Sequence, residues 1–150
     1  MKKILAIMFA ALAFTLAANA QPKAIGLRAG YGAEISYQHY LGGANFVEAD
    51  LGFMSNSFRA TGLYDFHLGS AGNFIFYAGP GASLGFANWV DGDGNARTSF
   101  QLAVAGQIGA EFVIPGAPIN LSLDWRPAIN LIGGPVFGWD GFALGIRYRF

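Results

Sequence analysis

Apolar and polar residues alternate along most of the chain after residue 20, which is the period of β-strands and not of α-helices. The C-terminal segment shows this most clearly, because Gly, Ala, Arg147 and Arg149 occupy every second position there. The positions between them hold bulky apolar residues, namely Phe142, Leu144, Ile146, Tyr148 and Phe150. Such alternation predicts strands with one apolar face and one polar face.

Eight segments of this kind predict an all-β protein, a closed antiparallel barrel of eight strands. The connection at residues 30–32 decides the count, because the first two strands would merge if it were not a turn. Pro80 and Pro127 fall inside two of the strands, where proline removes a hydrogen bond of the ladder, so we expect bulges there or adjustments of the partner strands. The predicted strands cover residues 24–31, 33–41, 46–53, 58–68, 74–86, 99–113, 119–130 and 140–150.

The connections between these strands alternate in length. Three are short and rich in Gly or Pro, and two on the other side of the barrel are longer. Short periplasmic turns and longer external loops are typical of barrels in bacterial outer membranes. The short connections are residues 42–45, 69–72 and 114–118, and the long ones are 87–98 and 131–139.

Periodicity alone does not say which face of the strands lies inside. A soluble, lipocalin-like barrel would turn its apolar face inward. Here the polar rows hold small residues, which suit a narrow interior, and five arginines nearly balance six carboxylates, as a buried interior requires. Bulky aromatics fall near both ends of the apolar rows, as in the girdles of membrane barrels. We therefore predict a charge network in the lumen, formed by Arg28, Glu34, Glu48, Asp50, Arg59, Asp65, Glu111, Asp124, Arg126, Arg147 and Arg149.

Composition and the N-terminus fit an exported membrane protein. Of the 150 residues, 53% are hydrophobic and only 12% are charged, against about 25% in ordinary globular proteins. Residues 1–20 predict a cleavable signal peptide, with Lys2 and Lys3, an apolar stretch and a cleavage site after Ala20, which leaves one domain at 21–150. That domain has seven basic and nine acidic residues, so nucleic acid is not an expected partner.

The titratable residues give little sign of catalysis. Asp65 and His67 lie on one predicted face, as a proton relay or a metal site would need, but zinc generally takes three or four ligands. A lipid deacylase would need a Ser–His pair near the outer rim, and His39 and His67 both map to the periplasmic end. Residues 91–95 resemble the start of a calcium loop whose Gly and Glu positions hold Ala and Leu. We expect no catalytic, cofactor-binding or metal-binding residue.

The segment Ile146-Arg147-Tyr148-Arg149-Phe150 resembles the C-terminal signal of outer-membrane barrels. The whole chain after residue 20 resembles the family of small eight-stranded outer-membrane β-barrels, of the OmpA transmembrane-domain and OmpX type. The segments that carry this resemblance are 26–31, 121–127 and 141–150. The resemblance implies insertion into outer-membrane lipid and recognition of Tyr148 and Phe150 by the barrel assembly machinery.

These features predict a non-enzymatic outer-membrane barrel with a structural or surface-interaction role and a filled lumen instead of a wide pore. An extracellular partner would contact the loops at 87–98 and 131–139. Three alternatives stay open: a soluble exported barrel that binds a small apolar ligand, a lipid-modifying barrel enzyme and a narrow pore. The loop residues expected to make the contact are Trp89, Asp91, Asp93, Arg97 and Trp139.

Overall fold

The computed structural model describes residues 23–30, 32–41, 45–133, 137–138 and 141–150, all of them in strands or in the connections between strands. The predicted signal peptide at 1–20 lies outside the described residues. In the described part, no helix is long and apolar enough to cross a membrane. The strands are β1 (Lys23–Ala29), β2 (Ala33–Tyr40), β3 (Phe46–Met54), β4 (Ser57–Ala71), β5 (Phe74–Val90), β6 (Ala96–Val113), β7 (Ile119–Trp125), β8 (Ala128–Ile132), β9 (Phe137–Gly138) and β10 (Phe142–Arg149).

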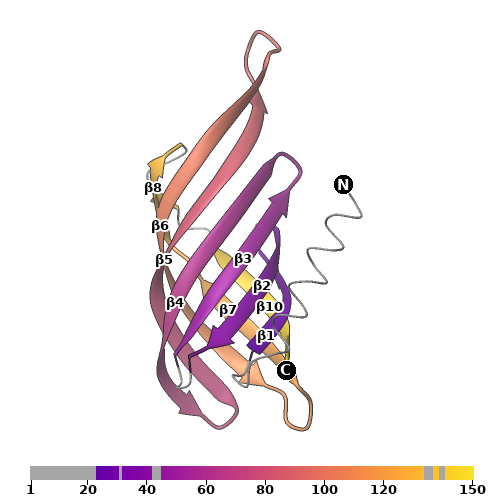
Figure 1. The fold of residues 1–150 in the computed structure, drawn as a ribbon, viewed down its shortest axis with the longest axis vertical. Coiled ribbons are helices and arrows are strands. Elements are labelled where there is room, and N and C mark those ends of the chain that lie inside the picture. The colour runs from indigo at the N-terminus through magenta and orange to yellow at the C-terminus, as the bar shows by residue number, and fades with distance from the viewer. Residues whose placement is uncertain (1–22, 31, 42–44, 134–136, 139–140) are drawn as a thin grey trace.

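The sheet closes on itself, as the sequence predicts. Neighbouring strands pair antiparallel from β1 to β7, and β10 pairs with both β1 and β7. Strand β1 pairs with β10 at the seam that closes the barrel, with Gly26 opposite Arg147 (Figure 1). Strands β1 and β2 are separate, because Ala29 pairs with Ala33 across the turn at 30–32. The closed barrel therefore has eight strands, and no edge of it is left unpaired.

The two prolines interrupt the ladders, and no bulge lies at either of them, so the expectation of bulges there is wrong. Pro127 follows the end of β7, and β8 continues the same strand against β6, in the same register from Ala128 to Asn130 and shifted by one residue at Ile132. The carbonyl of Pro127 still accepts a hydrogen bond of 2.9 Å from the amide of Gly106. Pro80 pairs in register with Gly106 from the other side. A proline loses only its amide donor, so each strand can pass through it with a gap and keep its register.

The β5–β6 hairpin is longer than predicted. Residues 87–90 and 96–98 were expected in a loop, but they extend the two strands up to the pair Val90 and Ala96. The hairpin therefore stands beyond the rest of the barrel (Figure 1). The carboxylate of Asp91 closes its turn by accepting hydrogen bonds from the amides of Asp93 and Asn95, each 3.0 Å long. These backbone bonds, together with Arg97, lower the pKa of Asp91 below its ordinary value.

The second long connection also contains strand residues. Strand β8 continues to Ile132, and β9 pairs with it through Phe137 opposite Ile129. Residues 134–136 and 139–140 lie outside the described part, and with them Trp139.

The outer surface of the barrel is apolar around its whole circumference. Leu144 is 64% exposed, and Leu27 and Phe142 are exposed to a similar extent. Aromatic pairs lie at both ends of this band, on neighbouring strands or along one strand. At the end that carries the hairpin they are Phe53–Phe58, Phe86–Phe100 and Trp125–Phe142, and at the end that carries the termini they are Phe74–Phe112 and Tyr148–Phe150.

The interior is narrow enough that glycine is required beside large side chains. Gly109 of β6 lies opposite Asp124 and Tyr77 on the two flanking strands. A Cβ atom at Gly109 would lie 2.6 Å from the ring of Tyr77 and 2.8 Å from the Cβ of Asp124. Tyr77 is fully buried and has no space into which to retreat.

Gly109→Ala should therefore lower the free energy of unfolding by about 1–3 kcal/mol, the usual cost of overpacking. Gly62→Ala is the matched control, since no atom lies within 4 Å of a Cβ built there. Urea unfolding of the folded protein in detergent measures both. Equal stability of the two variants would contradict the close packing described for Gly109.

Candidate functional site

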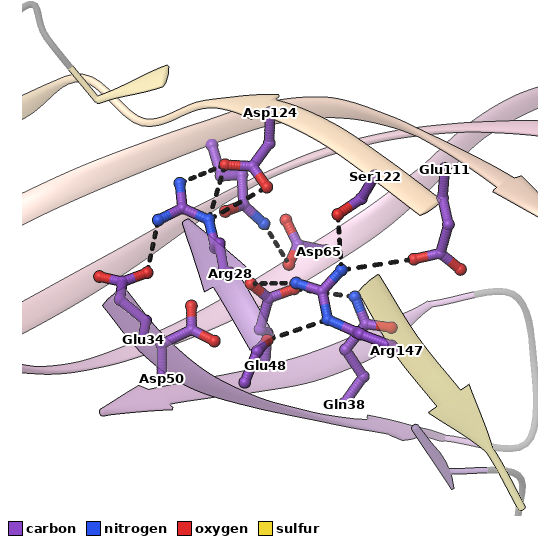
Figure 2. Close-up of polar contacts among 12 residues, drawn as sticks. Arg28, Glu34, Gln38, Glu48, Asp50, Asp65, Glu111, Ser122, Asp124 and Arg147 are labelled. Atoms are coloured by element: carbon purple, nitrogen blue, oxygen red, sulfur yellow. Dashed lines mark hydrogen bonds and ion pairs between the residues drawn. The ribbon is translucent and has the colours of Figure 1, made fainter. Parts of the chain in front are cut away.

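Arg28 forms the first ion-pair cluster of the lumen, at the level nearest the hairpin end. Its Nη1 donates to Glu34 over 2.5 Å. Its Nε donates to both carboxylate oxygens of Asp124, at 3.0 and 3.1 Å, and its Nη2 also bonds Asp124. Figure 2 shows the guanidinium between these two carboxylates. Arg28 thereby joins β1 to β2 and to β7, across the barrel interior.

Arg126 forms the second cluster from the gap between β7 and β8. Its Nη2 donates to Asp50 over 2.6 Å and to Glu48 over 3.0 Å, both on β3. The same nitrogen donates to the amide oxygen of Gln107 over 2.6 Å. Its Nη1 lies 3.6 Å from Glu34, which Arg28 also contacts. The interruption at Pro127 thus lies directly beside an arginine that reaches across the lumen to β3.

Arg147 forms the third cluster, on β10. It donates to the hydroxyls of Ser36 and Ser122, each over 2.9 Å. Its Nη2 lies 3.3 Å from Glu48, and its Nη1 lies 3.7 Å from Glu111 (Figure 2). Because Glu34 contacts Arg28 and Arg126, and Glu48 contacts Arg126 and Arg147, the three clusters form one continuous network. An eight-stranded barrel has an interior just wide enough for side chains, and this network occupies it.

Two of the predicted network residues do not join it. Arg59 is exposed at the hairpin end of the barrel and makes a hydrogen bond of 3.5 Å with Gln101. Arg149 is half-buried near the opposite end. Neither makes an ion pair with any described residue, because both lie at levels above or below the carboxylates. Asp65 is buried, but its bond is with the amide of Gln107, over 3.1 Å, and not with an arginine.

Uncharged partners complete the network, and the sequence analysis did not single them out. The amide of Gln38 donates to Glu48 over 2.9 Å, and Gln107 links Asp65 to Arg126. Both residues lie in rows that the alternation assigns to the inward face. This position could have identified them, since a buried polar residue must find a hydrogen-bond partner in the lumen.

The histidines do not form the site that the alternatives would need. His67 does not bond Asp65; its Nε2 lies 3.0 Å from the hydroxyl of Ser70, at the exposed end that carries the termini. A Ser–His contact therefore exists, but at the end away from the hairpin, and no described carboxylate orients the imidazole as in a catalytic triad. His39 lies beside Tyr37, with 3.2 Å between Nδ1 and the hydroxyl.

The residues expected to contact a partner lie at the opposite end, on the projecting hairpin. Trp89 is 51% exposed and pairs across the ribbon with Arg97, whose Nε lies 3.0 Å from Asp91. The carboxylate of Asp91 is thus occupied by protein donors, and no group of three metal-ligating side chains occurs among the residues that the structure describes. Asp93 is exposed in the turn.

A cup of about 400 Å³ opens at this same end of the barrel. Its floor contains Arg28, Glu34 and Arg126, so it ends where the ion-pair network begins. Its wall contains Arg59 and Gln101, together with hydroxyl and amide side chains from neighbouring strands.

Comparison with known proteins identifies the fold. No protein-family model matches the chain, and no curated protein matches it in sequence. The crystal structure of Neisserial surface protein A (NspA) is similar, with 18% identity and a TM-score of 0.53, over 87% of this chain and 94% of that one. The N-terminal β-barrel domain of Pseudomonas aeruginosa OprF is similar, with 11% identity and a TM-score of 0.60, over 87% of this chain and 96% of that one. The chain has the fold of small outer-membrane β-barrels.

Arg126→Met should lower the free energy of unfolding by about 3–5 kcal/mol, because it leaves Glu48 and Asp50 buried without that cation. Arg97→Met removes an ion pair whose arginine side chain is 58% exposed, and should cost less than about 1 kcal/mol. Urea unfolding in detergent, followed by tryptophan fluorescence, compares the two. A loss of the same size in both variants would show that the network does not stabilise the barrel.

Proposed function

We propose that this protein is an integral outer-membrane barrel with a closed lumen, which acts through its hairpin end by binding and not by catalysis. The observation that carries the proposal is the distribution of polarity. The charged rows of the strands point inward into one ion-pair network, and the apolar rows form a continuous exposed band. A lysine or arginine that faces lipid at the middle of the bilayer costs about 2–4 kcal/mol. A barrel in a membrane therefore needs an uncharged outer band of this kind.

The same distribution argues against a soluble barrel that holds an apolar ligand. Such a barrel needs an apolar interior, whereas the largest fully buried side chains here include Arg147, Gln38 and Glu48. In water, the exposed band would be a far larger apolar patch than soluble monomers tolerate.

The orientation follows from the lengths of the connections. The β5–β6 hairpin projects at the end opposite the one where β1 begins and β10 ends, and longer connections face outward in barrels of this fold (Figure 1). The hairpin, the cup and Trp89 would then face the cell exterior. Residues 1–20 would direct export, and Tyr148 and Phe150 at the periplasmic end would be recognised by the assembly machinery.

Binding is preferred to catalysis because of where the reactive groups lie. The Ser70–His67 contact is at the periplasmic end and is exposed, away from the outer leaflet on which a lipid deacylase would act. The charged groups of the lumen are engaged with one another and are not gathered around an open position.

The location can be tested by cell fractionation combined with gel migration. We expect the protein in the outer-membrane fraction, and we expect unheated samples to migrate differently from boiled ones, because a closed barrel resists detergent until it is heated. Recovery in the soluble periplasmic fraction would end the membrane proposal.

The closed lumen can be tested by electrical recording. The purified barrel in planar bilayers should give no steady conductance, since the network crosses the interior from β1 to β7, and from β10 and the β7–β8 gap to β3. A steady single-channel current from the unmodified protein would favour the narrow-pore alternative.

A further inference from the structure

We propose that the cup at the hairpin end is a binding site for a small acidic sugar, a hydroxyl-rich ring that carries one carboxylate. The cup is open on the side that the proposed function places outside the cell, and in that respect the inference rests on the proposed function. Its volume of about 400 Å³ falls within the 300–1,000 Å³ of typical small-molecule sites.

The arginines on the floor of the cup are already paired with carboxylates, which hold them in place. Arg28 is bonded to Asp124 and Glu34, and Arg126 is bonded to Glu48 and Asp50. These arginines are buried, and their donors are directed to carboxylates of the network. A ligand would therefore meet a rigid base whose polar groups are largely satisfied.

Arg59 on the wall of the cup is not paired with a described carboxylate in this way. It is exposed, its one described contact is the 3.5 Å hydrogen bond from Nη2 to Gln101, and it makes no ion pair with any described residue. A guanidinium presents a planar fork of donors that matches a carboxylate in two parallel hydrogen bonds. Arg59 is thus the cation of the cup that can hold an anionic group from solution.

The rest of the polar wall fits hydroxyl groups. Thr61 and Ser83 are buried hydroxyl side chains on β4 and β5, and Gln101 and Asn130 place amides on β6 and β8. These groups both donate and accept hydrogen bonds, as sugar hydroxyls require. All four lie on strands of the barrel and not in loops, so they need little reordering to bind.

The hairpin supplies an aromatic surface above the cup. Strand alternation places Ser83, Ala87 and Trp89 on one face of β5, and Ser83 and Ala87 line the cup. Trp89 is half-exposed two residues beyond Ala87. An indole in this place offers a flat apolar surface to a sugar ring that extends out of the cup.

The test uses the full barrel, purified and folded in detergent micelles, and titrates it with glucuronate, glucose and inorganic phosphate by calorimetry. We expect glucuronate to bind at least about tenfold more tightly than glucose or phosphate, because only glucuronate satisfies both Arg59 and the hydroxyl-binding wall. Arg59→Gln should weaken glucuronate binding about tenfold or more, to the level of glucose. Arg149→Gln, at the opposite end of the barrel and outside the cup, should leave it unchanged.

Three results would overturn the inference. Phosphate that binds as tightly as glucuronate would mean a simple anion site. Equal glucuronate affinity in Arg59→Gln and in the unmodified protein would remove Arg59 from the site, and absence of glucuronate binding by a barrel that shows heat-dependent migration would remove the site itself. Because binding is measured in micelles, its failure is distinct from a wrong cellular location, which fractionation decides.

Discussion

Pairing between arginine and carboxylate inside the barrel is the interaction on which the remaining structure depends. A chain that turns its apolar rows toward lipid must enclose its polar rows, and a buried charge without a partner is costly. Three guanidiniums meet this requirement by reaching across the lumen from β1, β10 and the β7–β8 gap to β2, β3, β6 and β7. The same contacts that satisfy the charges therefore also tie distant strands together.

Charged groups of the network make contacts with more than one partner, because three buried arginines face six inward carboxylates. Glu34 and Glu48 each contact two arginines, and Asp65 is held by the amide of Gln107. Serine and glutamine side chains supply further hydrogen bonds to the charged groups. The interior is thus a hydrogen-bonded polar core in which neutral residues matter as much as charged ones, which is why single substitutions there should propagate to several strands.

Alternation along the chain was sufficient to predict the barrel and the strand number, since a period of two assigns every residue to one of two faces. The small residues and nearly balanced charges of the polar rows then predicted which face points inward. Alternation could not predict the level of a residue along the barrel axis, which depends on strand tilt and stagger. That is why Arg59 and Arg149 were grouped with Arg28, although they lie at the ends. The strand extensions at 87–90 and 96–98 were missed because Asn88, Arg97 and Thr98 carry no apolar alternation outside the membrane.

The paired strands of the β5–β6 hairpin affect the energetics of binding at its tip. A loose loop must give up conformational freedom when it is captured, which subtracts from its affinity. Here, paired strands run as far as Val90 and Ala96, and the carboxylate of Asp91 fastens the turn. The tip is therefore preorganised, and a partner that binds it loses little affinity to ordering of the loop.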